Sequence, residues 1–173
     1  MGAIVSEFSG LSYKWPNDVL IRDRKLAGIL LESELSGGEA PDFLVIGVGV
    51  NIVASPQNVE YPATSLVEEG MGAVSPAALL DELARYFDCW GERWRRDGFA
   101  AVRTAWRARA NALGKPIRVR LDTGTLHGRF LDIDEEGALV LEVGEGRRRI
   151  SAGEIFPAAI GCPNRNESCL PVA

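Results

Sequence analysis

The first third of the chain alternates short apolar runs with polar corners, which predicts a succession of β-strands. Apolar runs at residues 19–21 and 29–31 have the length and composition of buried strands. Pro16 ends or bulges the strand before it, because proline has no N–H to donate to a ladder. Residues 43–52 are dense in Val and Ile and form the clearest predicted strand, whereas the proline-containing residues 54–62 are predicted to be a loop.

The middle third has a helical period. A helix is predicted to start at Ser75, an N-cap residue, with Pro76 in its first turn, and to end near Gly98. A second helix is predicted over residues 99–113. Apolar side chains recur at three- and four-residue spacing: Leu79, Leu80, Leu83, Phe87, Trp90 and Trp94 in the first helix, and Val102, Trp106 and Ala110 in the second. We expect these faces, tryptophans included, to pack in the core together with Cys89.

From residue 117 onward the hydrophobic period changes to two. Residues 117–121 alternate strictly, so Arg118 and Arg120 are predicted to point outward while the apolar residues between them point inward. Several short strands at this spacing are typical of a small barrel. We therefore expect three parts: a first domain over residues 1–114, the barrel over residues 115–156, and a disordered tail over residues 157–173.

Composition narrows the class of protein. Hydrophobic residues make up 46% of the 173 residues and charged residues 25%, which is typical of a globular protein. The net charge of −5 argues against nucleic-acid binding, and no apolar run approaches the ~18 residues that a membrane span needs. Three cysteines are too few for a disulfide framework, and the N-terminus does not resemble a signal peptide. These features favour a cytoplasmic protein without nucleic-acid or membrane partners.

Candidate chemistry begins at the first polar corner. Asn17 and Asp18 offer acceptor oxygens, although an Asx turn that satisfies local backbone donors is common and is the interpretation that these residues alone favour. Lys25 opens an otherwise apolar strand, where it either meets an anionic group or is a solvated strand-edge lysine. Lys14 either faces a phosphate or is solvated.

Three glycines lie inside predicted strands. Gly28, Gly47 and Gly49 weaken those strands unless a ligand or another backbone comes close, and a bulge or tight sheet packing is the alternative. Gly47 and Gly49 do not form a dinucleotide fingerprint, because the third glycine and the following helix are missing. With His127 as the only histidine, no Ser-His-Asp set is available.

Four segments in a fixed order carry a resemblance to a known family: Lys-Trp-Pro-Asn-Asp at residues 14–18, Arg-Lys-Leu-Ala-Gly-Ile-Leu at residues 24–30, Ile-Gly-Val-Gly-Val-Asn at residues 46–51, and Ala-Thr-Ser-Leu at residues 63–66. The chain resembles the biotin protein ligases over roughly residues 11–156. The resemblance implies an α+β fold, in which a partial mixed-sheet catalytic domain of the class II synthetase and biotin–lipoate ligase type precedes a small SH3-like β-barrel.

The resemblance also implies an activity. Members of this family use ATP and Mg²⁺ to convert biotin to biotinyl-AMP, and then transfer biotin to a lysine of a carboxylase biotin carrier domain. It implies that Lys25 is the catalytic residue that stabilises developing charge and that Asp18 is a magnesium ligand. The implied substrate-binding residues are Lys14, Asn17, Asp18, Gly28, Gly47, Gly49 and Asn51.

The chain departs from the family in one respect. The family's Gly- and Arg-rich loop precedes the Lys-Trp-Pro-Asn-Asp segment, but the similar residues 144–149 follow it and are predicted to be a hairpin turn with a solvated basic strand. We therefore expect an N-terminally truncated ligase without operator binding, whose partial sheet exposes apolar surface that a homodimer or a complementing chain covers. The alternatives are a partner-dependent biotin-binding module without turnover and a lipoate ligase-like acyl transferase.

Overall fold

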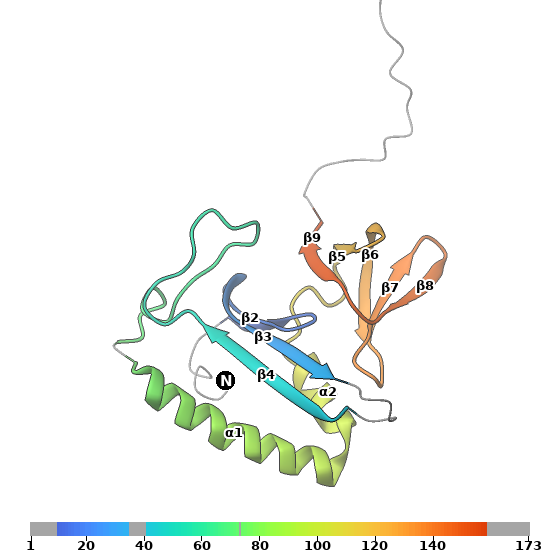
Figure 1. Cartoon of the computed structure of the whole chain (residues 1–173). Coiled ribbons are helices and arrows are strands. Elements are labelled where there is room, and N and C mark those ends of the chain that lie inside the picture. The colour runs from blue at the N-terminus through green and yellow to red at the C-terminus, as the bar shows by residue number, and fades with distance from the viewer. Residues whose placement is uncertain (1–9, 35–40, 73, 159–173) are drawn as a thin grey trace, which may run out of the picture.

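The computed structural model describes residues 10–34, 41–72 and 74–158, which form two β-sheets and two helices (Figure 1). The first sheet is antiparallel with the order β1-β2-β3-β4. Its strands are β1 (Leu11–Lys14), β2 (Asp18–Ile21), β3 (Arg24–Glu34) and β4 (Phe43–Val50). Strand β1 ends just before Pro16, as the sequence predicts, and β2 is buried along its whole length.

The second sheet is the predicted small β-domain and has the order β8-β7-β6-β5-β9. Its strands are β5 (Pro116–Leu121), β6 (Gly124–Ile133), β7 (Leu139–Val143), β8 (Gly146–Ile150) and β9 (Glu154–Pro157). Ile117 and Val119 are buried while Arg118 and Arg120 point outward, which confirms the alternation. Trp15 of the first part packs in this core, and its indole N–H donates to the Gly137 carbonyl at 3.0 Å.

The α+β class is confirmed, with one refinement of the sheet. The named strands of the first sheet pair antiparallel throughout, and parallel pairing among the described residues is limited to isolated bridges, Tyr13 with Ala110 and Lys25 with Ala63. Neither described helix is long and apolar enough to cross a membrane. Residues 159–173, which contain most of the predicted tail with Cys162 and Cys169, lie outside the described residues.

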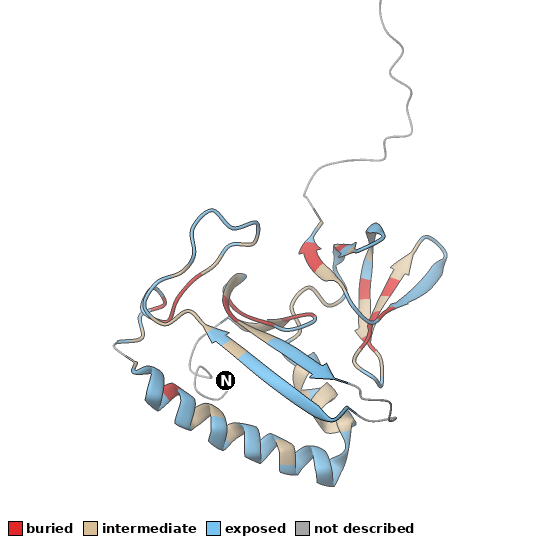
Figure 2. Cartoon of the chain, in the orientation of Figure 1, coloured by how far each residue is buried: buried red, intermediate tan, exposed pale blue. Residues whose placement is uncertain are grey.

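Helix α1 (Pro76–Asp97) begins as predicted, because the Ser75 hydroxyl accepts from the Ala78 N–H, but its apolar face is not in the core. Leu79 is buried, whereas Leu80 and Trp94 are about three-fifths exposed (63% and 59%). Figure 2 shows most of the helix coloured as exposed. The prediction that this face, Trp90, Trp94 and Cys89 are core was wrong: Phe87, Trp90 and Cys89 are exposed as well. Among the described elements its main neighbour is α2, so little covers it.

Helix α2 (Phe99–Arg107) is shorter than the predicted helix over residues 99–113. The chain leaves the helix because its backbone pairs with β1: the Tyr13 N–H donates to the Arg109 carbonyl, and the Asn111 N–H donates to the Tyr13 carbonyl. Trp106 does pack against the barrel core, with its ring centroid 6.4 Å from that of Phe130. The helix thus ends where long-range pairing replaces its own hydrogen bonds.

Candidate functional site

One carboxylate holds two lysines at the start of the first sheet. Lys14 ends β1 and lies opposite Asp18, the first residue of β2, so that the Lys14 Nζ lies 2.8 Å from the Asp18 Oδ2. The Lys25 Nζ, from β3, lies 2.6 Å from the other oxygen, Oδ1. The pairing of β2 with β3 is irregular beside this point, and such a bulge re-aims a side chain. Asp18 therefore connects the two cations.

The two lysines differ in exposure. The side chains of Lys14 and Asp18 are 2% and 7% exposed, so their charges are tolerated because they are paired. The Lys25 side chain is 41% exposed, so it contacts solvent as well as Asp18. Glu154 lies 3.9 Å from the Lys14 Nζ, so two carboxylates face two cations, and Lys25 is the more exposed cation that an anionic ligand can touch.

Gly28 makes room for the ion pair. A Cβ at this position would lie 3.2 Å from the Lys25 Nζ and 3.4 Å from the Asp18 Oδ1, so a side chain would crowd both. Gly49 pairs with Gly28 in register, and no described atom lies within 4 Å of a Cβ built there. Gly47 also has only ordinary contacts. The tight-packing alternative therefore fails for Gly49, and the two paired glycines leave a bare strip of backbone beside Lys25.

Two asparagines hold the backbone of the site. The Asn51 side-chain amide donates to the Lys25 carbonyl at 3.3 Å and to the Thr64 carbonyl at 3.0 Å. The Asn17 amide donates to the Ile29 carbonyl, so it does not satisfy a local turn as the Asx-turn alternative requires. Both side chains lie near the cluster, and their amide N–H groups orient strands rather than reach out of the site.

Lys14 is enclosed by groups that the sequence analysis did not identify. Its Nζ lies 4.6 Å from the centre of the Tyr61 ring and 5.6 Å from that of Phe156, and 3.9 Å from the Glu154 Oε1. The alternative that Lys14 is solvated was wrong. Tyr61 comes from the loop after β4, and Glu154 and Phe156 come from β9, so no local spacing signals their approach.

A buried carboxylate behind the site was also missed. The Glu69 side chain is fully buried, accepts from the Thr64 hydroxyl at 2.7 Å, and pairs with Arg24 at 2.6 Å and with Arg22 at 3.2 Å. These contacts fix the segment after β4 against the turn that precedes Lys25. The residues before and after Lys25 are therefore both anchored.

The donors around Asp18 do not fit a magnesium ion in this arrangement. Both carboxylate oxygens face the ammonium groups of Lys14 and Lys25, and Mg²⁺ needs such oxygens for itself. Within residues 10–34, 41–72 and 74–158 no group of three or more His, Cys, Asp and Glu side chains is placed to hold a metal. The role of Asp18 as a magnesium ligand stays a prediction without structural support.

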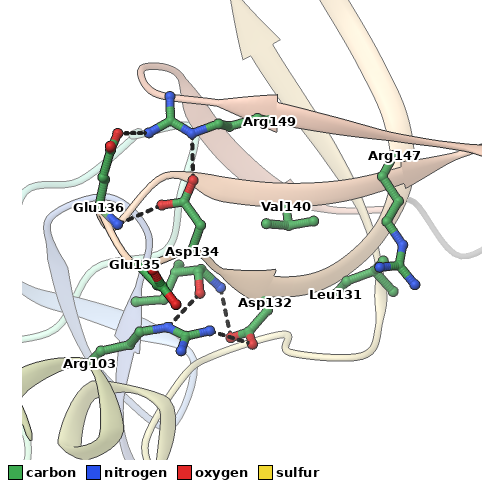
Figure 3. Close-up of a pocket in the computed structure, with 10 residues that line it drawn as sticks. Arg103, Leu131, Asp132, Asp134, Glu135, Glu136, Val140, Arg147 and Arg149 are labelled. Atoms are coloured by element: carbon green, nitrogen blue, oxygen red, sulfur yellow. Dashed lines mark hydrogen bonds and ion pairs between the residues drawn. The ribbon is translucent and has the colours of Figure 1, made fainter. Parts of the chain in front are cut away.

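A surface hollow lies elsewhere, between α2 and strands β6 to β8 (Figure 3). It has a volume of about 660 Å³ and is lined by charges that pair with one another. Arg103 contacts Asp132 at 2.8 Å, and Arg149 pairs with Asp134 and Glu136. Because most of its lining charges pair with one another and Lys25 is not among its residues, we do not assign the chemistry to this hollow.

Comparison with known proteins agrees with this geometry. The model of the biotin/lipoate A/B protein ligase family matches residues 3–108, and that of the biotin protein ligase C terminal domain matches residues 112–156. A biotin--[acetyl-CoA-carboxylase] ligase of Paracoccus denitrificans is 43% identical over 161 residues, which are 90% of this chain and 67% of the relative. One of Mycobacterium tuberculosis is 38% identical over 143 residues, 82% of this chain and 51% of the relative.

A solved structure also resembles this chain. The biotin protein ligase from Aquifex aeolicus in complex with biotin and ATP superposes with a TM-score of 0.70 and 26% identity, covering 90% of this chain and 64% of the other. The chain spans about half to two thirds of the length of these curated relatives. The fold of a sheet followed by a small β-domain is thus shared with this biotin protein ligase.

Proposed function

The chain belongs to the biotin protein ligase family, and from this premise we propose that it activates biotin with ATP and transfers biotin to a lysine of a carboxylase carrier domain. A carboxylate oxygen of biotin attacks the α-phosphorus of ATP; the new P–O bond forms as pyrophosphate leaves. The acceptor lysine amine then attacks the acyl carbon, AMP leaves and the amine loses a proton. The substrates named for the relatives support this proposal.

The exposed Lys25 ammonium beside Asp18 is the observation that carries the proposal. Negative charge grows on the phosphate and acyl oxygens in both steps, and a fixed cation in a partly enclosed site stabilises it. Lys25 is paired at its side chain with Asp18 and held at its backbone by Asn51, so its ammonium lies beside the site before substrate arrives. We assign Lys25 the charge-stabilising role.

The remaining predicted residues take supporting roles in this proposal. Gly28, Gly47 and Gly49 give the substrates access to the backbone of β3 and β4, and Asn17 and Asn51 hold those strands. When bound with ATP, Mg²⁺ would neutralise phosphate charge. We also propose domain limits at residues 114 and 156. A cytoplasmic location is part of the same proposal and is consistent with the few cysteines.

Exposed apolar surface favours a partner protein. Leu30 and Leu31 of β3 are 60% and 59% exposed, and β4 and α1 add exposed Leu, Val, Ile and Trp side chains. Apolar patches of this kind mark interaction surfaces. We propose that a second copy of this chain or a complementing chain covers them in the working enzyme.

A second candidate function is a biotin-binding module without turnover. It is favoured by the same exposed apolar surface. A lipoate ligase-like transferase is the third candidate, since the family model includes lipoate ligases, but the match of residues 112–156 to a biotin protein ligase domain favours biotin.

The direct test is ATP-dependent biotinylation of an apo carrier domain by the purified chain and by Lys25→Met. We expect the substitution to lower the rate by about 10²–10³-fold, the usual effect of removing one preorganised charge-stabilising donor. Lys115→Met is the matched control, because Lys115 is an exposed lysine outside the site. Biotin binding by the wild-type chain without labelling would instead support the binding module, and lipoylation in its place the transferase.

A further inference from the structure

Lys14 is a buried cation at the boundary between the two sheets. On one side it holds the Asp18 Oδ2 at 2.8 Å, and on the other it meets Glu154 and the ring of Phe156 from β9. Tyr61 covers it from the loop after β4. No other cation in the described residues touches both the Asp18 carboxylate and the small β-domain, so Lys14 joins the site to that domain.

We propose that Lys14 is a positioning residue through which the small β-domain sets how firmly Asp18 holds Lys25. The inference rests on the role proposed above for Lys25 and deepens it. Lys14 occupies one carboxylate oxygen and balances the Asp18 charge, so Lys25 is paired with the other oxygen but is not locked to it. An anionic substrate can then draw the Lys25 ammonium away from Asp18.

A second set of contacts connects the same two parts. Glu60 pairs with Arg118 at 3.3 Å and with Arg120 at 2.7 Å, both on β5. The hydrogen bond from Arg120, followed by the charges of both arginines, holds the pKa of Glu60 below its usual value. The loop that carries Glu60 and Tyr61 is therefore attached to the small β-domain.

The residues that follow Tyr61 in that loop form backbone hydrogen bonds with Lys25. The Lys25 N–H donates to the Pro62 carbonyl at 2.7 Å, and the Lys25 carbonyl accepts from the Thr64 N–H at 2.9 Å. The small β-domain thus reaches Lys25 through its backbone as well as through Lys14 and Asp18. Two routes from the small β-domain therefore end on Lys25, one at its side chain through Lys14 and Asp18 and one at its backbone.

A purely structural role for Lys14 predicts a different result. In that case Lys14 only compensates the buried Asp18 charge. Any variant that destabilises the boundary between the two sheets would then have the same effect on the site. Positioning instead predicts an effect with a sign: without the Lys14 ammonium, the whole Asp18 charge acts on Lys25 and holds it more tightly. The reactivity of the Lys25 amine separates the two cases.

The experiment measures acetylation of Lys25 by acetic anhydride, followed by mass spectrometry, in the full chain. We expect Lys14→Met to slow acetylation about tenfold, the effect of a charge-assisted hydrogen bond in a partly buried site. The double variant Lys14→Met/Asp18→Asn should instead react faster than wild type, because Lys25 then has no carboxylate partner. Phe156→Leu, which removes one wall around Lys14, should slow the reaction by less.

Phe130→Leu is the matched control, since Phe130 is an equally buried phenylalanine of the small β-domain without a contact to Lys14. Equal acetylation in Lys14→Met and wild type, or equal slowing in Phe130→Leu and Phe156→Leu, would overturn the proposal. If Lys14→Met does not fold by circular dichroism, the two phenylalanine variants decide alone. Carrier biotinylation measured in parallel tests the ligase function separately, because its absence in wild type leaves the acetylation comparison intact.

Discussion

At the scale of single residues, the proposed chemistry rests on Asp18 and its two lysines. Lys14 is enclosed and Lys25 is open to solvent, although both contact the same carboxylate. The buried Lys14 holds the buried Asp18 carboxylate in place, and Lys25, the second partner of that carboxylate, stays accessible to a ligand. The proposed distinction between a supporting Lys14 and a charge-stabilising Lys25 thus follows from burial, which the sequence pattern alone does not contain.

Gly28→Ala tests whether the Lys25–Asp18 ion pair requires a glycine at position 28. The new Cβ would lie 3.2 Å from the Lys25 Cε and Nζ, so the lysine must move by several tenths of an ångström. We expect kcat for biotinylation to fall by about tenfold or more, because small misplacements of a catalytic group are costly. Gly146→Ala, also in a strand but with its nearest contact at 3.8 Å, is the control. An unchanged kcat would show that Lys25 does not act from this position.

Tyr61 supplies a prediction about pH. Burial, and then the charges of Asp23 and Asp18, raise the pKa of Tyr61 from 10.0 to about 12. The folded protein therefore keeps a proton between pH 10 and 12 that the unfolded chain has lost, so the free energy of unfolding falls as the pH rises through this window. We expect Tyr61→Phe to lose about 1 kcal/mol less than wild type over that range, after discounting for the half-exposed ring.

Urea unfolding at pH 9 and at pH 11.5 measures this difference. All other titrating groups are common to the two proteins, so subtracting the two pH dependences isolates Tyr61. Parallel curves for wild type and Tyr61→Phe would mean that Tyr61 titrates normally and is not enclosed beside Lys14.

At the scale of elements, close approach between strands makes Gly128 indispensable. A Cβ at Gly128 in β6 would lie 2.2 Å from the Glu142 carbonyl oxygen of β7 and 2.8 Å from Leu141, so the two strands must separate. We expect Gly128→Ala to lower the free energy of unfolding by about 3 kcal/mol, in the range of overpacked cores. Gly146→Ala should change it by less than about 1 kcal/mol. Similar urea midpoints for the two variants would contradict this account of the β6–β7 pair.

Elements were predictable where their cause is local. The period of two in β5 and the Ser75 cap of α1 follow from neighbouring residues, and the structure confirms both. The end of α2 was not predictable, because pairing of residues 109–111 with Tyr13 decides it. The burial of α1 was not predictable either: a helical period gives an apolar face but not the element that covers it.

The same limit applies to the site. Lys14 and Asp18 face each other across a corner, a pairing that the sequence did not predict, and Lys25 is three residues from Gly28, the partner of Asp18 in register. Strict alternation would place Lys25 on the opposite face, and the bulge brings it back. Resemblance to a family identified Lys25, whereas the contacts of Tyr61 and Phe156 needed the fold.

At the scale of the whole molecule, apolar surface and function are linked. Leu31 and Ile46 are directly opposite each other on β3 and β4, and both are exposed. Burying such side chains is worth about 25 cal/mol per Å² of apolar surface, so association through this face is favourable unless another chain covers it. We expect the purified chain, of 18.7 kDa, to sediment above the monomer mass with increasing concentration.

The double variant Leu31→Lys/Ile46→Glu tests whether this face is responsible. It leaves the net charge unchanged, and the opposed side chains form a cross-strand ion pair that keeps the sheet intact. We expect it to sediment as a monomer with the circular dichroism spectrum of wild type. If biotinylation is lost together with association, a second copy completes the enzyme; if activity is retained by the monomer, the face is not needed for catalysis. A wild-type chain that stays monomeric at all concentrations would exclude self-association and leave a complementing chain as the partner.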